Sequence, residues 1–337
     1  MQVFSPELLQ NLGIVDWGGT HRERPESFDH FSNWVDKGLH NPLHYLGDHR
    51  KELRSNLKNV FPEYQTALVF LFSYAKTTKE FSDFYESDES NGLRMASYVL
   101  GFEGLDYHIV LLEKLERLKK ELLKSYPQAK IIHSLDIQPI LERDLAYSSG
   151  LGWFGKNSML INQKHGSYFI IGSLLIDQKI DYPEKQIEID HCGSCTKCID
   201  FCPTDAIDPE ARTLISEKCI STYTIEVFKP ERMDPPSKME ESRGEIYGCD
   251  ICQDVCPWNQ KVFKSMEMES HFLSEKLSEN TKLLFEFFLS RPKEEVIAEL
   301  KSMSNKAFEK KFKQTPLART RRVGVLKNLE FWQNLES

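Results

Sequence analysis

The chain has 337 residues and a formal net charge of −8, with 40% hydrophobic and 28% charged residues. This composition excludes a collagen-like, low-complexity or broadly disordered protein, and the length favours two or three domains. The longest unbroken apolar run, residues 67–72, is far shorter than the roughly 20 residues of a membrane helix. The first residues lack the basic and apolar regions of a secretory signal, so we expect a cytoplasmic protein that does not bind membranes.

The region from residue 1 to about residue 183 alternates predicted helices with predicted strands. Helical patterns occur at 6–12, 28–37, 42–57 and 106–123, and the last has apolar residues at regular helical spacing. Buried strands are expected at 66–74, 129–135, 158–162 and 167–176. Helices that alternate with strands predict a layered α/β (α+β) domain.

The rest of the chain divides into a cysteine-rich region, residues 184–262, and a helical C-terminal segment, residues 263–337. The first region holds all eight cysteines and shows little hydrophobic periodicity, so it needs an inorganic group to hold it together. In the second, Leu and Phe alternate with Lys and Glu at helical spacing. We therefore predict three consecutive domains with boundaries near residues 183 and 262.

The cysteine spacing is typical of a double 4Fe–4S ferredoxin. Residues 192–203 form a C-x2-C-x2-C-x3-C-P run, and a second run with its first cysteine displaced upstream ends at Pro257. In two-cluster ferredoxins the fourth cysteine of a run binds the other cluster. The predicted ligand sets are Cys192, Cys195, Cys198 and Cys256 for one cluster, and Cys202, Cys219, Cys249 and Cys252 for the other. The alternative is a pair of four-cysteine zinc sites, although zinc modules favour two separate C-x2-C pairs.

Two further patterns allow more than one interpretation. Residues 150–155 match the G-x-G-x-x-G dinucleotide fingerprint, but they follow a helical pattern and lead into a strand, the reverse of what nicotinamide binding requires. We interpret them as a tight backbone turn. Asp136 ends a buried strand and is flanked by apolar residues, which suits a proton donor with a raised pKa. On the residues alone, a capping Asp before Pro139 is the preferred interpretation.

The C-terminal segment carries a basic stripe. Residues 301–328 contain nine Lys or Arg and one Glu, in a chain whose net charge is −8. A basic stripe on an acidic body can bind a polyanion, whereas the simpler interpretation is a solvated helix face. The densest part of the stripe is residues 319–328.

Several ordered stretches resemble the epoxyqueuosine reductase family: residues 135–157, 166–176, 219–226 and 246–259, together with the double cysteine motif. The resemblance extends over about residues 34–327. It implies a cobalamin-dependent iron–sulfur oxidoreductase that reduces epoxyqueuosine, at the wobble position of tRNA, to queuosine. It also implies base-off cobalamin in an N-terminal domain similar to reductive dehalogenases and cobalamin-processing proteins, although no spacing in the chain indicates cobalamin.

The resemblance also implies roles for individual residues. Asp136 corresponds to the proton donor, and the corrin is expected to contact Tyr98, Asp136, Asn162, Ser173, Ser221, Cys249 and Asp250. The resemblance ends soon after Asn328, so tRNA contact is expected to rest on the domains present. The candidates are Arg319, Arg321, Arg322 and Lys327. The expected partners are tRNA containing epoxyqueuosine and an external electron donor, and we expect a monomer.

Two other functions would use the same cysteines. A reductive dehalogenase-like corrinoid oxidoreductase would share the cofactors, but such proteins are usually exported and the chain shows no twin-arginine leader. A plain ferredoxin-type electron carrier would explain the cysteines but would leave residues 1–183 without a role. A spectrum of the protein with added cobalamin would separate the carrier from the two corrinoid enzymes.

Overall fold

The structure is a computed structural model that describes residues 3–266, 272 and 274–335. It divides into two compact units, each made of separate stretches of chain. Unit 1 comprises Met1–Ser73, Val110–Thr196 and Pro257–Val262, and unit 2 comprises Tyr74–Ile109, Lys197–Cys256 and Phe263–Ser337. This differs from three consecutive domains. Apolar side chains between residues 81 and 100 share one buried core with the C-terminal helices, which brings 74–109 into unit 2.

Unit 1 is built on a four-stranded sheet. Its strands are β1 (Ile14–Thr20), β2 (Thr66–Ser73), β7 (Phe169–Ile176) and β4 (Ile131–Ser134), in that order. Every neighbouring pair is antiparallel. The layered expectation is therefore confirmed in the form of an α+β sheet.

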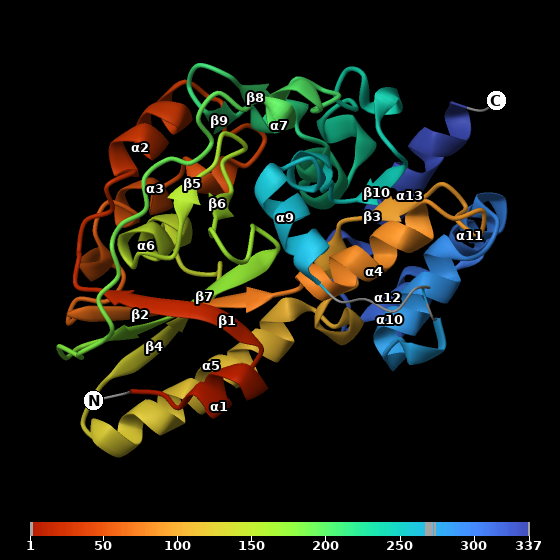
Figure 1. Ribbon diagram of the computed structural model, residues 1–337. Helices are drawn as coiled ribbons and strands as arrows, with labels where there is room; N and C mark the ends of the chain where they lie inside the picture. Colours follow the sequence, from red (N-terminus) through yellow and green to blue (C-terminus); the bar gives the residue numbers. More distant parts are fainter. Residues whose placement is uncertain (1–2, 267–271, 273, 336–337) are drawn as a thin grey trace. The chain divides into compact units, whose positions relative to one another are not determined.

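Helices cover both faces of this sheet (Figure 1). One face carries α1 (Pro6–Asn11) and the part of α5 (Tyr107–Ser125) that belongs to unit 1, and the other carries α2 (Phe28–Asp36), α3 (Arg50–Leu53) and α6 (Glu142–Ser148). Because successive side chains of a strand point to opposite faces, β2 is buried on both, which explains its continuous apolar sequence. Val69 and Leu71 share a core with Leu145 of α6, whereas Phe70 packs against Phe4 on the α1 side.

The glycine-rich stretch is a turn, as predicted. It follows α6 and leads into a short hairpin of β5 (Trp153–Phe154) and β6 (Leu160–Ile161). Gly152 has a φ of 151°, and a Cβ there would overlap the Ile161 carbonyl. The hairpin needs glycine at this position, and the stretch does not open a helix as a nucleotide fingerprint would.

Most other predicted elements are confirmed within a few residues at each end, but the helix expected at 42–57 is wrong. That stretch forms two short 3₁₀ turns, η1 (His44–Leu46) and η2 (Leu57–Asn59), on either side of α3. Gly47 ends the first turn, and the Asp48 carboxylate accepts the Arg50 backbone N–H at 2.9 Å, which begins a new helix. β1 was not among the predicted strands.

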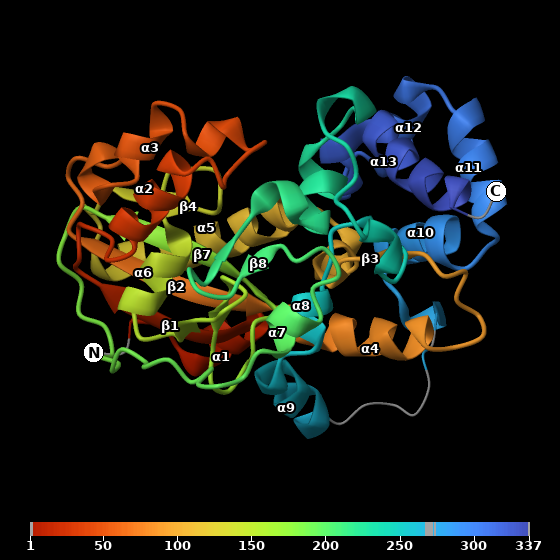
Figure 2. The ribbon, with the colours of Figure 1, turned by 90° about the horizontal axis from the view of Figure 1, so that it is seen from above.

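Unit 2 is mainly helical. It contains α4 (Ala75–Tyr85), α10 (Glu279–Leu284), α11 (Lys293–Ser302), α12 (Asn305–Phe312) and α13 (Leu317–Asn334), together with a parallel pair, β3 (Arg94–Met95) and β10 (Glu245–Tyr247). Its cysteine region carries α7 (Lys197–Asp200), α8 (Ile251–Asp254) and a hairpin of β8 (Ile207–Asp208) and β9 (Thr213–Leu214) (Figure 2). α9 (Pro257–Ser265) begins in unit 1. No helix of the described residues is long and apolar enough to cross a membrane.

Candidate functional site

The predicted proton donor, Asp136, lies in unit 1 directly after β4. Its φ of 52° is in the left-handed region, which non-glycine residues seldom adopt. Its backbone N–H donates to Oε1 of Glu142 at 2.6 Å, and the Ser134 hydroxyl donates to the same oxygen at 2.9 Å. Burial raises the pKa of Glu142 to about 7, against the lowering effect of these two hydrogen bonds. The end of β4 therefore brings together the carboxyl groups of Asp136 and Glu142, and the pKa of Glu142 is close to neutral pH.

The polar residues around Asp136 and Glu142 make different contacts. Ser173 of β7 is the register partner of Ser134, so both hydroxyls point to the α6 face of the sheet. Ser173 is fully buried and its Oγ has no hydrogen-bond partner within the described part of the chain. The Arg143 guanidinium donates to the Ser158 carbonyl. Asp144 is buried and accepts the Ser27 backbone N–H at 2.7 Å, so its role is to fix the chain before α2.

Asn162, another predicted corrin contact, uses its whole side chain inside unit 1. Its Nδ2 donates to the Asp16 carboxylate at 3.1 Å and to the Leu151 carbonyl at 2.8 Å. Its Oδ1 accepts the backbone N–H groups of Lys164 and His165 at 2.9 and 3.0 Å. The side chain thus organises the turn after β6, and the backbone N–H and C=O of Asn162 pair with Gly166 at 2.7 and 3.0 Å.

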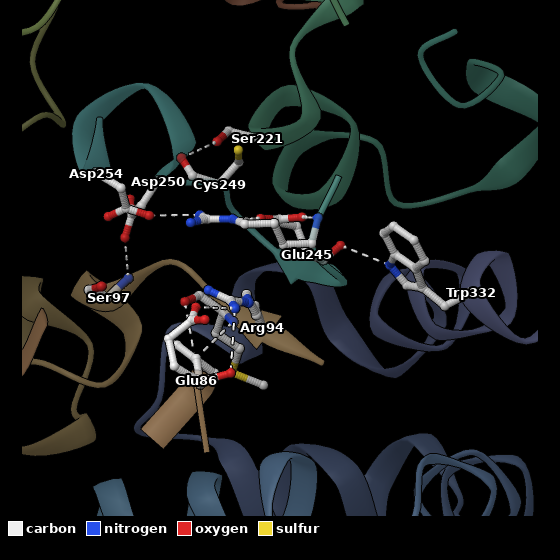
Figure 3. Close-up of polar contacts among 12 residues, drawn as sticks. Glu86, Arg94, Ser97, Ser221, Glu245, Cys249, Asp250, Asp254 and Trp332 are labelled. Atoms are coloured by element: carbon white, nitrogen blue, oxygen red, sulfur yellow. Dashed lines mark hydrogen bonds and ion pairs between the residues drawn. The ribbon is translucent and has the colours of Figure 1, made fainter. Parts of the chain in front are cut away.

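In unit 2 the predicted Cys249–Asp250 pair begins α8 (Figure 3). One Asp250 oxygen accepts the Ser97 backbone N–H at 2.6 Å, and the other accepts the Gln253 side-chain amide at 3.2 Å. Burial, followed by the nearby Asp254 carboxylate, raises the pKa of Asp250. The Ser221 hydroxyl lies 3.5 Å from the Cys249 carbonyl. The structure therefore brings Ser221, Cys249 and Asp250 together next to residue 97.

Tyr98, the remaining predicted corrin contact, directly follows Ser97. Burial, together with Tyr247 and Tyr107, raises its pKa well above the ordinary value. Its ring meets that of Tyr107 edge to face, with centroids 6.0 Å apart. Tyr98 is therefore packed into unit 2 beside the Ser221, Cys249 and Asp250 group.

A charged network beside Cys249 was not predicted from the sequence. Glu245 is buried, and its carboxylate accepts the backbone N–H of Arg243 at 2.7 Å and its Nε at 3.2 Å. The Arg243 guanidinium also pairs with Asp254 at 2.7 Å. Figure 3 shows Glu245 and Asp254 in this network, and the Glu245 charge helps to raise the pKa of Cys249. The sequence does not indicate this network, because its residues come from two elements, β10 and α8, that are brought together only by folding.

None of the eight cysteines, all of which lie in the described part of the chain, forms a disulfide. Cys192 and Cys195 belong to unit 1 and the other six to unit 2. Burial raises the pKa of Cys219, Cys249 and Cys252, and each of them also interacts with other cysteines. Cys252 interacts with Cys219, Cys202 and Cys198, and Cys249 interacts with Cys252 and Cys219. The four predicted ligands of the second cluster all lie in unit 2, as does Cys198 of the first set, and thiols are the donors that an iron–sulfur cluster requires.

The residues of the basic stripe lie in different environments on α13. Arg319 is exposed and pairs with both carboxylate oxygens of Glu226, at 2.7 and 2.9 Å. Arg321 is exposed, and Arg322 donates to Asn305 and to the Leu300 carbonyl. Lys327 is buried, and its Nζ donates to the Tyr223 carbonyl at 2.8 Å. The amine of Lys327 is therefore not presented on the surface that the stripe predicted.

Comparison with known proteins supports the interpretation of the cysteines. The family model of a 4Fe-4S double cluster binding domain matches residues 191–259. The model described as epoxyqueuosine reductase QueG, DUF1730, matches residues 54–136. The epoxyqueuosine reductase of Cyclobacterium marinum is 33% identical over 323 residues, which cover 96% of this chain and 92% of that protein.

Solved structures of epoxyqueuosine reductases share the fold. One contains a tRNA-Tyr epoxyqueuosine-modified stem loop; it is 22% identical with a TM-score of 0.72, and the match covers 96% of this chain and 78% of that one. Another, from Bacillus subtilis, has its catalytic Asp loop swung out of the active site. It is 22% identical with a TM-score of 0.71, and the match covers 96% and 79% of the two chains.

The cysteine runs and the double-cluster match define an iron–sulfur protein of the 4Fe–4S class, which decides against the zinc alternative. The relationship to the Cyclobacterium marinum reductase extends over nearly the whole of both chains. The chain belongs to the epoxyqueuosine reductase family.

Proposed function

We propose that this chain reduces the epoxide of epoxyqueuosine in tRNA to the alkene of queuosine. The observation that carries the proposal is the match of 96% of the chain to an epoxyqueuosine reductase, with the double-cluster region included. The reaction adds two electrons and two protons to the epoxide and releases its oxygen as water. The protein must therefore supply an electron path and an acid at the reacting oxygen.

The cysteines supply the electron path. We assign Cys192, Cys195, Cys198 and Cys256 to one 4Fe–4S cluster, and Cys202, Cys219, Cys249 and Cys252 to the other. Two clusters with interleaved ligands pass electrons one at a time, so the external partner is an electron donor. All four cysteines of the second set lie in unit 2, which supports that set.

Cobalamin is the proposed electron acceptor of the clusters. When bound, it would supply a low-valent cobalt centre that reacts with strained epoxides. The residues proposed to hold it are Tyr98, Asp136, Asn162, Ser173, Ser221, Cys249 and Asp250. The buried Ser173 hydroxyl fits such a group, because it lacks a hydrogen-bond partner among the described residues and a bound cofactor would supply one.

Asp136 is the proposed proton donor to the departing oxygen. Its place at the end of β4, beside a second carboxyl group, suits a loop that presents an acid to a substrate. We also propose that this loop has two positions, by analogy with the Bacillus subtilis enzyme and its displaced catalytic loop. On the tRNA side, we propose that the exposed Arg319 and Arg321, with Arg322, contact phosphates.

The test is conversion of epoxyqueuosine in tRNA by anaerobically reconstituted protein with an artificial electron donor, followed by mass spectrometry of the nucleosides. Asp136→Asn keeps the size of the side chain but removes the acid, so turnover should fall by about 10²–10⁴. Cluster absorption and cobalamin binding should not change. The exposed Asp181→Asn is the matched control; Asp144→Asn is unsuitable because Asp144 fixes Ser27.

Two results would count against the proposal. Full turnover by Asp136→Asn would assign the acid to another group. A protein that holds its clusters but gives no corrinoid spectrum after reconstitution would be a ferredoxin-type carrier.

A further inference from the structure

Glu142 lies next to Asp136 and has no part in the proposed chemistry. It is the first residue of α6, and one oxygen of its carboxylate accepts two hydrogen bonds. The donors are the Ser134 hydroxyl at 2.9 Å and the Asp136 backbone N–H at 2.6 Å. One carboxylate therefore joins the last residue of β4 to the residue proposed as proton donor.

The backbone of Asp136 needs such a contact. A φ of 52° is unfavourable for a residue with a Cβ, and it persists only where the surroundings hold it. Within this loop the Ile140 N–H also donates to the Gln138 carbonyl at 2.8 Å, and the Leu135 N–H contacts the Gln138 side chain at 3.4 Å. The short bond from Asp136 N–H to Glu142 acts on the backbone of Asp136 itself, so it is a direct polar restraint on this conformation.

We propose that Glu142 is the latch of the catalytic loop: its carboxylate holds Asp136 in the working position, and loss of that contact lets the loop leave. This rests on the proposed role of Asp136. Glu142 is a positioning residue, because it acts through the Asp136 backbone and not on the substrate.

The latch should respond to pH. Burial raises the pKa of Glu142 to about 7. The Asp136 N–H and the Ser134 hydroxyl lower that pKa, the Asp136 charge raises it and the Arg143 charge lowers it, in that order of size. The Asp136 N–H makes a stronger hydrogen bond to the ionised carboxylate than to the neutral carboxyl, and only the closed loop has this bond, so this contact favours ionised Glu142. By linkage, protonation of Glu142 favours the open loop, so opening should increase as the pH falls through about 7.

Amide hydrogen exchange of residues 135–141 tests the latch directly on the iron–sulfur protein, without tRNA. In the wild type, protection corrected for the intrinsic exchange rate should decrease from pH 8 to pH 6. Glu142→Gln replaces charge-assisted hydrogen bonds with neutral ones, so exchange should be faster by about tenfold and its pH dependence should disappear. The exposed Glu113→Gln on α5 is the matched control and should leave both unchanged.

A second variant keeps the test informative if Glu142→Gln folds poorly. Ser134→Ala removes one of the two donors but leaves the carboxylate and the Asp136 N–H, so exchange should be intermediate and still depend on pH. Unchanged protection and pH dependence in Glu142→Gln would overturn the latch. So would loss of protection throughout unit 1, since that would assign Glu142 a general structural role.

The experiments distinguish the proposal that Glu142 is the latch from the proposal that Asp136 is the proton donor. Asp136→Asn keeps the backbone N–H, so the loop should remain latched while turnover falls. If Asp136→Asn turns over normally but Glu142→Gln still opens the loop, the proton donor is wrong and the latch stands. If Asp136→Asn is inactive and Glu142→Gln changes neither exchange nor the pH profile of turnover, the latch is wrong and the donor stands.

Discussion

Lys327 shows how a side chain that the sequence marks as a surface cation can become part of a core. Its exposed fraction is 7%, and its Nζ lies 3.4 Å from the centroid of the Tyr223 ring. Burial lowers its pKa to about 7, although the Tyr223 carbonyl and ring favour the charged form. We infer that Lys327 holds α13 against the segment around Tyr223.

This burial predicts a pH dependence of stability. The pKa of Lys327 is about 7 in the folded protein and about 10.4 in the unfolded chain. Between these values the unfolded chain binds more protons, so stability should rise with pH from 7 towards 10. Below pH 7 both states are protonated and the full cost of burying the charge remains. Lys327→Met should lose this rise, measured as the difference in Tm between pH 7 and pH 9.5.

The exposed Lys313→Met is the control and should keep the wild-type pH dependence. A Lys327→Met protein with the same pH dependence as the wild type would show that the amine is solvated.

Sequence reasoning reached some of these residues and missed others for physical reasons. Asp136 was singled out because a strand end and its flanking apolar residues are adjacent in the chain, and its role as proton donor stays a prediction. The role of Glu142 could not, since it depends on a turn that returns α6 to the end of β4. Arg243 and the burial of Lys327 depend on contacts between elements distant in sequence, which local patterns do not encode.

At the scale of elements, α13 joins two segments that carry cysteines. The Asn328 side-chain amide donates to the Thr224 and Ile246 carbonyls, both at 2.8 Å. Thr224 belongs to the π-helical turn η6 (Thr222–Glu226), which follows Cys219. Ile246 lies in β10, which precedes Cys249. A helix predicted as a tRNA-binding surface therefore also supports the proposed second cluster.

Asn328→Ala should weaken that support. It leaves two buried carbonyl groups without their donors, so unfolding should become easier by about 2 to 4 kcal/mol. Iron of the second cluster should also be released to a chelator faster than in the wild type. The exposed Asn334→Ala, near the end of the same helix, should change neither measurement. Equal loss of iron in both variants would contradict a specific role for Asn328.

The predicted elements succeeded where hydrophobic burial is local. β2 and β7 were found because a strand covered on both faces is apolar throughout. The short strand β1 contains Asp16 and two glycines, which hide its pairing with β2. The helix expected at 42–57 failed because Gly47 and Asp48 end one turn and begin another.

For the whole molecule, each compact unit is assembled from stretches that are not consecutive in the chain. Local composition separates residues 1–183, 184–262 and 263–337, but residues 74–109 pack with the C-terminal helices. Such packing depends on which apolar faces pack against each other. The sequence pattern predicts that each helix has an apolar face, but not which element that face contacts. The cysteine spacing is independent of this packing, so the cluster motif was predicted even though the units were not.

The metal content is a prediction for the entire chain. Eight thiolate ligands serve two cubes, so anaerobically purified protein should hold about eight iron and eight sulfide per chain and negligible zinc. Cys195→Ser should remove the electron paramagnetic resonance signal of one cluster and leave that of the other. The exposed Ser194→Ala, in the same loop, is the matched control and should keep both signals. Bound zinc without sulfide would contradict the assignment.

The charge distribution predicts how tRNA binding should respond to salt. Residues 301–328 carry nine Lys or Arg and one Glu, in a chain of net charge −8. If Arg319 and Arg321 contact phosphates, affinity should fall as salt rises, and replacing both with Gln should flatten the log–log slope by about 1–2 units. Reduction of the clusters by an artificial donor should not change. Lys327→Met is the control, because a buried amine makes no phosphate contact, and its slope should equal that of the wild type. An unchanged slope in the double Arg variant would show that this surface is only a solvated helix face. Arg319 would then serve the ion pair with Glu226 and not a phosphate contact.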